Sequence, residues 1–343
     1  MIKKIGQFFM SFLLVLWLTS TTAWAALAVY FGDSRSSTVL LILSIVVALI
    51  GLTAVIALLF IPSMRNWLLS IHGIVFLVVL LWWFNIQPSN DRNWQTDVSK
   101  LAYASIESDL VTVHDIRNFS YHSEFDYSPD YYDKTFDVNK LEGVDLFAVY
   151  WMGPAIAHVI MSFDFGENDH LAISIEARKE EGEGYSTIKG FFRQYELMYI
   201  VADERDVIGL RTNYREDPPE QVYRYRIKAP IEAVKHLFLK YVDRINSLHE
   251  KPVFYNSLLH NCTTAIWLNS REVNPDHVPF SWKILVSGYL PEYLYESGRL
   301  DPQLSFAKLR DHAYVNPLLK GGEISTLFST IIRPQSAHME QEQ

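Results

Sequence analysis

Long apolar stretches dominate the first 86 residues of the chain. They span residues 5–30, 38–61 and 67–86. Each stretch is close to the ~20 residues needed to cross the hydrocarbon core of a bilayer. The only ionisable residue in the third stretch is His72, and residues 82–84 (Trp-Trp-Phe) resemble an interfacial aromatic belt. The pattern predicts a three-helix transmembrane anchor over residues 1–86, without an intramembrane charge pair that would indicate a transport pathway.

The first apolar stretch has two interpretations. Lys3 and Lys4 precede it, and residues 23–25 (Ala-Trp-Ala) resemble a signal-peptide cleavage site. The stretch continues past this point to Tyr30, which favours an uncleaved helix. With the lysines and Arg65 on the cytoplasmic side, both interpretations place everything after the third stretch outside the cytoplasm. We therefore expect a multi-pass membrane protein whose domain after the third stretch lies outside the cytoplasm.

The remainder of the chain divides by composition. Residues 87–120 are interpreted as a linker with a juxtamembrane amphipathic segment, and residues 121–140 as a surface loop rich in Tyr and Asp. The soluble domain is predicted over residues 121–333, which is enough chain for one domain of ordinary size. Residues 334–343 are polar and are expected to form a disordered tail.

Apolar and polar residues alternate with a period of two through the middle of the domain, which is typical of strands. Strands are predicted over residues 146–151, 158–165, 171–176, 196–212 (with a break at 202–205) and 221–228. The period then becomes helical. Helices are predicted from Pro230 to about 250, from Cys262 onward, and over 282–297 with an interruption at Pro291. An antiparallel sheet flanked by late helices indicates an α+β fold.

Charge and short motifs exclude several classes of function. The net charge of −9, without a long basic run, argues against nucleic-acid binding. The chain contains no Gly-rich phosphate loop and no HExxH or CxxC spacing, so no cofactor and no metal are expected. The single cysteine excludes an internal disulfide and leaves a free thiol in an oxidising compartment.

That cysteine, Cys262, lies where an amphipathic helix is predicted to begin. Asn261 suits the N-cap position, and Thr263 suits the first turn. Backbone N–H groups at a helix start stabilise a thiolate, and they would also stabilise an oxyanion formed beside it. Taken alone, an isolated cysteine is more often a small buried apolar residue.

A histidine and a carboxylate are expected to face each other across a hairpin. If 158–165 and 169–177 pair around an odd-length loop, paired positions sum to 334, and His158 lies opposite Glu176. Opposed residues lie ~5 Å apart at Cβ, within reach of a His–carboxylate hydrogen bond. An even-length loop would break the pairing. In the alternative interpretation, Glu176 and Arg178 form a surface ladder on a half-exposed strand.

Other histidines are weaker candidates for a base. In the same register His170 faces Asp164 at the turn and is expected to be solvated. His260 precedes the helix start and is expected to shape the loop. His236 and His249 lie on the charged side of the 231–250 helix, where a structural or solvated role is expected.

Three segments together resemble the family of the Lnb N-terminal periplasmic domain, over about residues 115–285. They are AHVIMSFDF…HLAISIEAR, ELMYIVADERDVIGLRTNYR and YNSLLHNCTT. A His strand that precedes an Asn-Cys helix start also resembles circularly permuted papain-like folds, which include NlpC-type cell-wall peptidases and lecithin–retinol acyltransferases. The resemblance implies a papain-like fold with Cys262 as nucleophile, His158 as base and Glu176 as orienting group.

The resemblance also implies an activity. Lnb is similar to a membrane-bound transacylase that completes lipoprotein N-acylation, which implies acyl transfer from a lipid chain to an amine. We expect Asn261, Thr263, Tyr255 and Arg178 to support the substrate or the oxyanion. This chain has its membrane helices before the domain, whereas Lnb proteins of this type often carry them after it, so the acceptor is open. A peptidoglycan or peptide hydrolase and a non-catalytic envelope scaffold are the alternatives.

Overall fold

The computed structural model describes residues 2–32, 37–273, 276–319 and 327–333. The tail predicted at 334–343 lies outside the described residues. The chain separates into two compact units, and each is described here by itself. The first unit contains the N-terminal helices together with segments 185–196 and 254–256, and the second contains the rest.

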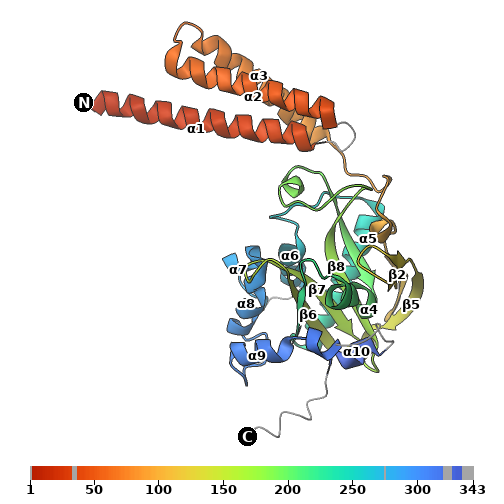
Figure 1. The fold of residues 1–343 in the computed structure, drawn as a ribbon. Helices are drawn as coiled ribbons and strands as arrows, with labels where there is room; N and C mark the ends of the chain where they lie inside the picture. The colour runs from red at the N-terminus through yellow and green to blue at the C-terminus, as the bar shows by residue number, and fades with distance from the viewer. Residues whose placement is uncertain (1, 33–36, 274–275, 320–326, 334–343) are drawn as a thin grey trace. The chain divides into compact units, whose positions relative to one another are not determined.

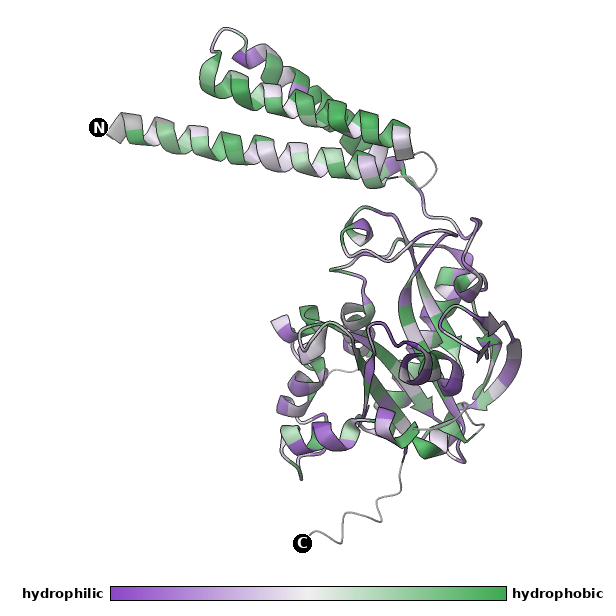
Figure 2. Ribbon diagram, viewed as in Figure 1, coloured by the Kyte–Doolittle hydropathy of each residue, from purple (hydrophilic) through white to green (hydrophobic). Residues whose placement is uncertain are grey.

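Three helices long and apolar enough to cross a membrane form most of the first unit (Figures 1 and 2). They are α1 (Ile2–Phe31), α2 (Ser37–Phe60) and α3 (Arg65–Asn85). Small residues such as Ala25, Ala28 and Ala54 are buried within the bundle, whereas most of the large apolar side chains are exposed. That distribution suits a lipid environment, and the three predicted apolar helices are confirmed.

The loop that contains the short helix η3 (Lys189–Phe191) packs against the end of α3. The Arg193 guanidinium lies 4.0 Å from the ring centroid of Trp83 and donates a 2.9 Å hydrogen bond to the Trp83 carbonyl. Phe192 stacks against Phe31, with ring centroids 5.8 Å apart. An aromatic residue of the predicted interfacial belt is therefore covered by a cation from later in the chain.

An eight-stranded sheet forms the centre of the second unit, in the order β1-β2-β9-β8-β7-β6-β10, with β5 also paired to β2. Its strands are β1 (Tyr103–Glu107), β2 (Leu110–Arg117), β5 (Tyr131–Asp137), β6 (Gly143–Tyr150), β7 (Ala157–Asp164), β8 (His170–Arg178), β9 (Glu196–Ala202) and β10 (Gln221–Arg226). The pairs β1–β2, β2–β5, β6–β7, β7–β8 and β6–β10 are antiparallel, and β2 pairs with β9 in parallel. A separate two-stranded sheet joins β3 (Ser120–Tyr121) and β4 (Tyr127–Ser128).

The structure confirms the predicted mixture of helices and a mostly antiparallel sheet, and it corrects three segments. The predicted linker contains β1 and β2, and the predicted Tyr-rich loop contains β5. These strands lie toward one end of the sheet, and their outer faces carry polar residues, so the alternation there is weak. The second half of the 196–212 prediction is helical: β9 ends at Ala202, and α4 (Glu204–Val207) and the π-helix η4 (Leu210–Tyr214) follow.

Helices cover both faces of the sheet. Helix α5 (Ile231–Glu250) packs on one face, where the rings of Phe163 and Phe238 are 5.2 Å apart. Helix α6 (Cys262–Val273) lies on the same face, where Asn269 donates to the Tyr199 hydroxyl. On the other face, α4 and α10 (Phe328–Ile331) join a buried cluster that includes Ile160 of β7. Alternate residues of β7 therefore face opposite layers.

Short helices complete the second unit. They are η1 (Thr96–Val98), η2 (Val138–Lys140), α7 (Trp282–Leu285), η5 (Ser287–Tyr289), α8 (Leu290–Glu296), α9 (Phe306–Ala313) and η6 (Asn316–Leu319). The predicted 282–297 helix is interrupted, but at 286–289 rather than at Pro291. Pro291 lies in the first turn of α8, where the missing N–H has no intrahelical partner to lose.

Candidate functional site

The thiol occupies the first position of α6, and the residue before it caps the helix. Asn261 Oδ1 accepts a 2.9 Å hydrogen bond from the Thr264 N–H, and Thr264 Oγ1 accepts one of 3.0 Å from the Asn261 N–H. This reciprocal pair is a capping box with Thr in place of the usual Glu or Gln. The predicted N-cap is confirmed, and it fixes the backbone that carries Cys262.

The β7–β8 hairpin has the register that the sequence predicts. Its paired residues run from Asp164↔His170 to Ile160↔Ser174, and each pair sums to 334. Two residues beyond the last pair, His158 Nε2 lies 3.5 Å from Glu176 Oε1. The hairpin therefore brings together the histidine and the carboxylate that the sequence places opposite each other.

A serine connects these two side chains. Ser174 Oγ lies 2.6 Å from His158 Nε2 and donates a 2.7 Å hydrogen bond to Glu176 Oε1. A serine hydroxyl has one donor and two acceptor positions, so it can serve both neighbours at once. Because Nε2 is engaged by Ser174 and Glu176, Nδ1 is the ring nitrogen left for the side-chain hydrogen bond between His158 and Cys262.

The Cys262 sulfur lies where the layers on the two faces of the sheet meet. His158 is on the face of β7 that also carries Ile160, and α6 packs on the opposite face. The contact occurs beyond the last registered β7–β8 pair, where the backbone N–H of Val159 reaches the sulfur together with that of Thr263. Two backbone donors and an imidazole therefore converge on the Cys262 sulfur.

These contacts determine the protonation of the pair. Burial raises the pKa of the Cys262 thiol, but hydrogen bonds from His158, Val159 and Thr263 outweigh it, and the pKa falls below its ordinary value. Burial and the Arg211 charge lower the pKa of His158, but its hydrogen bonds to Cys262 and Glu176 raise it overall. Opposite shifts in two bonded groups favour a thiolate–imidazolium pair.

An arginine behind the carboxylate extends the network. Arg211 of η4 is buried and donates to Glu176 Oε1 at 3.1 Å and to Glu220 Oε2 at 3.3 Å. Arg215 binds the other oxygen of Glu220 at 2.9 Å. Burial raises the pKa of Glu176, but the hydrogen bond to His158 and the Arg211 charge hold it well below its usual range. The carboxylate is therefore ionised and can stabilise an imidazolium.

Ser174, Arg211 and the Val159 amide are absent from the sequence prediction. Ser174 could have been found, because it is two residues from Glu176 on the same strand face. Arg211 had no comparable signal: it lies in a π-helix where the sequence predicts a strand, and its partner is remote in sequence.

The predicted support residues have different surroundings. Thr263 contributes its N–H at the sulfur, and its hydroxyl donates to the Ile284 carbonyl at 2.6 Å. Tyr255 belongs to the first unit, where its N–H donates to the Tyr195 carbonyl.

Arg178 is only 2% exposed, which excludes the surface-ladder interpretation. It donates to the Val98 and Ser99 carbonyls at 2.8 and 2.6 Å and lies 4.2 Å from the ring centroid of Trp94. These contacts give Arg178 a structural role in holding the 94–99 segment, rather than the predicted role beside the thiol.

The other histidines lie outside this network. His170 pairs with Asp164 as predicted, but it is only 8% exposed at the start of β8, so the expected solvation is wrong. His260, His236 and His249 are exposed. Among the residues that the structure describes, no group of three or more His, Cys, Asp or Glu side chains could hold a metal ion.

Comparisons with known proteins find one family to which most of this unit is similar. Residues 127–288 match the family model described as Lnb N-terminal periplasmic domain. That segment includes β6 to β8, η4, α5, α6 and the side chains of Cys262, His158 and Glu176. Curated proteins and solved structures yield no match. The resemblance seen in the sequence is thereby confirmed: residues 127–288 are similar to the Lnb N-terminal periplasmic domain.

Proposed function

We propose that this protein is a membrane-anchored cysteine acyltransferase with a papain-like site, in which Cys262 carries the acyl group as a thioester. The observation that supports this proposal is the hydrogen-bonded series Cys262–His158–Ser174/Glu176, with the pKa of the thiol lowered and that of the imidazole raised. A nucleophile, a base and an oriented carboxylate are the parts that acyl transfer requires.

The first half-reaction acylates the enzyme. The Cys262 thiolate attacks the ester carbonyl, and the N–H groups of Val159 and Thr263, which already face the sulfur, are placed to donate to the developing oxyanion. As the intermediate collapses, the C–S bond is kept, the ester C–O bond breaks, and the His158 imidazolium gives its proton to the leaving alkoxide.

The second half-reaction releases the acyl group. An acceptor amine attacks the thioester carbonyl, the C–N bond forms, and neutral His158 takes the proton of the amine. The C–S bond then breaks and regenerates the thiolate beside an imidazolium. With water as acceptor, the same steps give hydrolysis, so the acceptor alone separates a transferase from a hydrolase.

The location of the protein favours a lipid donor. The apolar helices and the family of the second unit fit a membrane protein with a periplasmic domain. We propose that the helices form a multi-pass anchor in the bacterial inner membrane, with the thiol on the periplasmic side. A lipid or a lipoprotein is then the donor, and an amine such as a lipoprotein N-terminus is the acceptor.

Intact-protein mass spectrometry tests the proposed function. Full chain in detergent is incubated with p-nitrophenyl acetate, and an acetyl adduct is expected on Cys262 that hydroxylamine removes. Cys262→Ser must abolish the adduct, and His158→Gln must slow its formation at least about 100-fold. No adduct on the wild-type thiol would contradict the proposed function and favour the envelope scaffold.

A product assay then separates the two enzymes. Vesicles with radiolabelled phospholipid acyl chains are incubated with the full chain and a diacylglyceryl peptide that has a free α-amine. Label transferred to the peptide supports acyl transfer. Release of soluble muropeptides from peptidoglycan, without transfer to the peptide, would contradict it and favour the hydrolase.

A further inference from the structure

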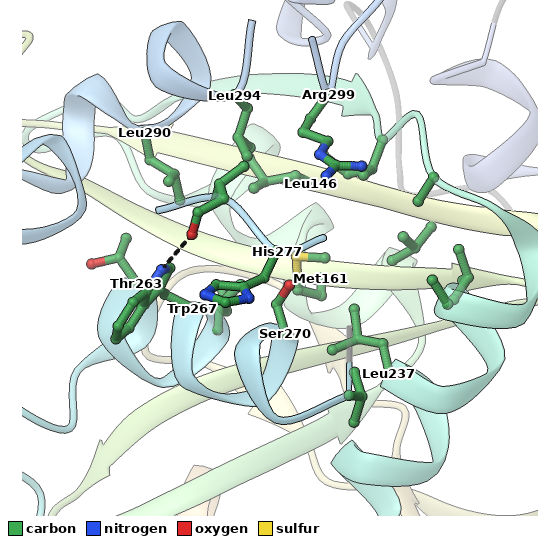
Figure 3. Close-up of a pocket in the computed structure, with 18 residues that line it drawn as sticks. Leu146, Met161, Leu237, Thr263, Trp267, Ser270, His277, Leu290, Leu294 and Arg299 are labelled. Atoms are coloured by element: carbon green, nitrogen blue, oxygen red, sulfur yellow. Dashed lines mark hydrogen bonds between the residues drawn. The ribbon is translucent and has the colours of Figure 1, made fainter. Parts of the chain in front are cut away.

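Two pockets of the second unit differ in what their walls offer to a ligand. The first lies between β6, β7, α5, α6 and α8 and is mostly apolar: the indole N–H of Trp267 in its wall donates to the Val278 carbonyl at 2.9 Å (Figure 3). The second lies where the end of β6, the start of β10 and α9 meet, and it encloses about 560 Å³ including its mouth. Its wall contains Arg310, and we call it the Arg310 pocket.

Aromatic rings hold the cation of the Arg310 pocket. The guanidinium carbon of Arg310 lies 5.7 Å from the ring centroid of Tyr150 and 5.2 Å from that of Tyr223. Within the described part of the chain, no carboxylate forms an ion pair with Arg310. A guanidinium that contacts ring faces keeps the N–H groups in its own plane as donors. The pocket therefore offers a positive charge whose hydrogen-bond donors are available to a ligand.

Tyr150 fixes the position of this cation. It is 7% exposed, and its hydroxyl donates a 2.7 Å hydrogen bond to the Gly288 carbonyl. Burial raises the pKa of Tyr150 to about 12, and the Arg310 charge acts in the opposite direction, so the charge reaches the ring. Glu292 also affects this pKa, but its carboxylate is paired with Lys283 at 3.1 Å. The positive charge of the pocket therefore keeps its attraction for an anionic ligand.

The rest of the wall combines flat apolar side chains with a further donor. The rings of Trp151, Pro154 and Pro219 line the pocket. Gln221 Oε1 accepts a 3.2 Å hydrogen bond from the Tyr223 hydroxyl, which leaves the amide N–H groups of Gln221 as donors. A pyranose ring has an apolar face of C–H groups and a rim of polar substituents. A sugar therefore matches a wall of this composition.

An extended peptide fits this pocket less well, because the backbone of β10 is already bonded. β10 is the last strand of the sheet, but residues 314–316 cover its outer edge. The Val315 N–H donates to the Val222 carbonyl at 3.0 Å, and Asn316 Oδ1 accepts from the Val222 N–H at 2.8 Å. A peptide strand cannot pair with these groups, so recognition at the pocket depends on side chains.

We infer that the Arg310 pocket binds a sugar that carries a carboxylate. The guanidinium pairs with the carboxylate through two parallel N–H···O bonds, which is the arrangement that the planar fork of an arginine favours. The Trp151 and proline rings cover the apolar face of the sugar, and Gln221 donates to a ring substituent. The site is separate from the chemistry proposed at Cys262 and gives the second unit a binding function of its own.

Ligand-observed NMR with the full chain in detergent tests the site. The ligand is N-acetylmuramic acid, and its matched control is N-acetylglucosamine, which has the same pyranose ring but lacks the lactyl carboxylate. Titration with saturation-transfer detection gives a dissociation constant for each sugar. We expect saturable binding of N-acetylmuramic acid and at least about tenfold weaker binding of N-acetylglucosamine, because the hydrogen bonds to the charged carboxylate are lost.

Two substitutions assign the binding to the Arg310 pocket. Arg310→Met removes the cation and is expected to weaken the binding of N-acetylmuramic acid at least about tenfold. Lys308→Met is its control, because Lys308 is an exposed cation on the same helix and does not line the pocket. Gln221→Glu keeps the acceptor for Tyr223 but adds a negative charge, so binding should weaken as well. Circular dichroism and thermal unfolding show whether Arg310→Met folds, and the exposed Gln221→Glu replaces it if it does not.

Several results would overturn the carboxylate-sugar site. These are the absence of saturable binding, equal binding of the two sugars, and binding that the folded Arg310→Met and Gln221→Glu variants leave unchanged. N-acetyl-d-alanine carries a carboxylate without a sugar ring, and binding as tight as that of N-acetylmuramic acid would contradict sugar recognition. Cys262→Ser should lose acetylation and keep sugar binding, so the failure of this inference and the failure of the proposed function are distinguishable.

Discussion

Cys262 and His158 shift each other's pKa, and the pH dependence of the reaction at Cys262 measures this coupling. The pKa of the thiol is lowered and that of the imidazole is raised, and both shifts favour the thiolate–imidazolium pair over the neutral pair. On the acidic limb of the pH profile the thiolate becomes protonated, and this limb lies below the pKa of an ordinary thiol. On the basic limb the imidazolium loses its proton, and this limb lies above the pKa of an ordinary imidazole. Acylation should therefore follow a bell-shaped pH profile.

Alkylation of the single cysteine measures the acidic limb. The iodoacetamide rate of wild type is expected to rise at a pH below that of an ordinary thiol, because the thiolate forms early. In His158→Gln the inflection should move up toward the ordinary value, since the largest favourable partner is lost. His236→Gln, on the exposed face of α5, is the control. An unchanged inflection in His158→Gln would falsify the ion pair.

Arg211 is expected to control both stability and reactivity through Glu176. It is buried between the Glu176 and Glu220 carboxylates, so Arg211→Met leaves buried charge unpaired at a cost of about 3–5 kcal/mol. Loss of its charge should also raise the pKa of Glu176, which weakens the hold on His158. The melting temperature and the acetylation rate are therefore expected to fall together.

Arg215→Met is the matched control for Arg211. Its side chain is 29% exposed, and it shares Glu220 with Arg211, so the carboxylate keeps one partner. We expect a stability loss of about 1 kcal/mol or less, without a change in acetylation. Equal effects of the two substitutions on acetylation would show that Arg211 has no specific link to the site.

At the scale of elements, local sequence patterns were enough to predict a helix or strand where one of its faces is buried. The sequence predicts the β7–β8 register on the condition of an odd-length loop, and the structure has that register. The same reasoning placed His158 opposite Glu176, and the capping pattern placed Cys262 at a helix start. The strands β1, β2 and β5, toward one end of the sheet, were not predicted, because burial constrains only part of each strand.

Other parts of the site depend on contacts that no local pattern contains. Arg211 reaches Glu176 across 35 positions of the chain, from a π-helix that hydrophobic periodicity cannot identify. The apolar pocket that Met161 and Trp267 line joins five elements, and each of them alone is an ordinary amphipathic segment. The positions of the thiol, the imidazole and the carboxylate are therefore predictable from the sequence, whereas the side chains that support them require the tertiary structure.

The turn before β7 depends on a close backbone approach at Gly288 of η5. A Cβ at this position would lie 2.0 Å from the Pro154 carbonyl oxygen, and the Gly288 N–H donates to the Ala155 carbonyl. Gly288→Ala must therefore displace the backbone that leads into His158. We expect a loss of about 1–3 kcal/mol and a slower acetylation of Cys262.

Thermal unfolding and the acetylation assay measure both effects of Gly288→Ala. Gly184→Ala is the control, because its Cβ would meet nothing within 4 Å and its φ is not positive. That substitution should leave both readouts unchanged, or raise stability slightly by restricting the unfolded chain. A Gly288→Ala variant with wild-type stability and rate would show that the turn before β7 does not depend on this approach.

At the scale of the whole molecule, a C-terminal arginine holds together parts of the second unit that are remote in sequence. Arg333 donates to Glu204 Oε1 at 2.5 Å and to Asp145 Oδ2 at 2.8 Å, and both carboxylates are fully buried. It thereby connects the end of the chain to α4 and to β6, on the same side of the sheet as Ile160. Asp145 also binds Arg224, at 3.1 Å.

The stability that this cluster contributes should depend on pH in a defined direction. Burial raises the pKa of Glu204, but Arg333 overcomes it and lowers the pKa to about 2, from an ordinary value of 4.5. A carboxylate with a depressed pKa stabilises the fold above its ordinary value, and the contribution disappears as the pH falls toward about 2. At about 1.4 kcal/mol per pH unit, the contribution near neutral pH is about 3 kcal/mol.

Arg333→Met should therefore lower stability by about 3–5 kcal/mol at pH 7, because two buried carboxylates lose their shared partner. The difference from wild type should shrink as the pH is lowered from 4.5 toward 2, since protonated carboxyls no longer need the cation. Arg226→Met is the control: Arg226 is 41% exposed and lies 3.6 Å from the same Asp145, so its loss should cost about 1 kcal/mol or less. Thermal unfolding of the full chain in detergent from pH 3 to pH 7 measures both variants, and a pH-independent deficit in Arg333→Met would mean that packing, not charge, anchors the C-terminal segment.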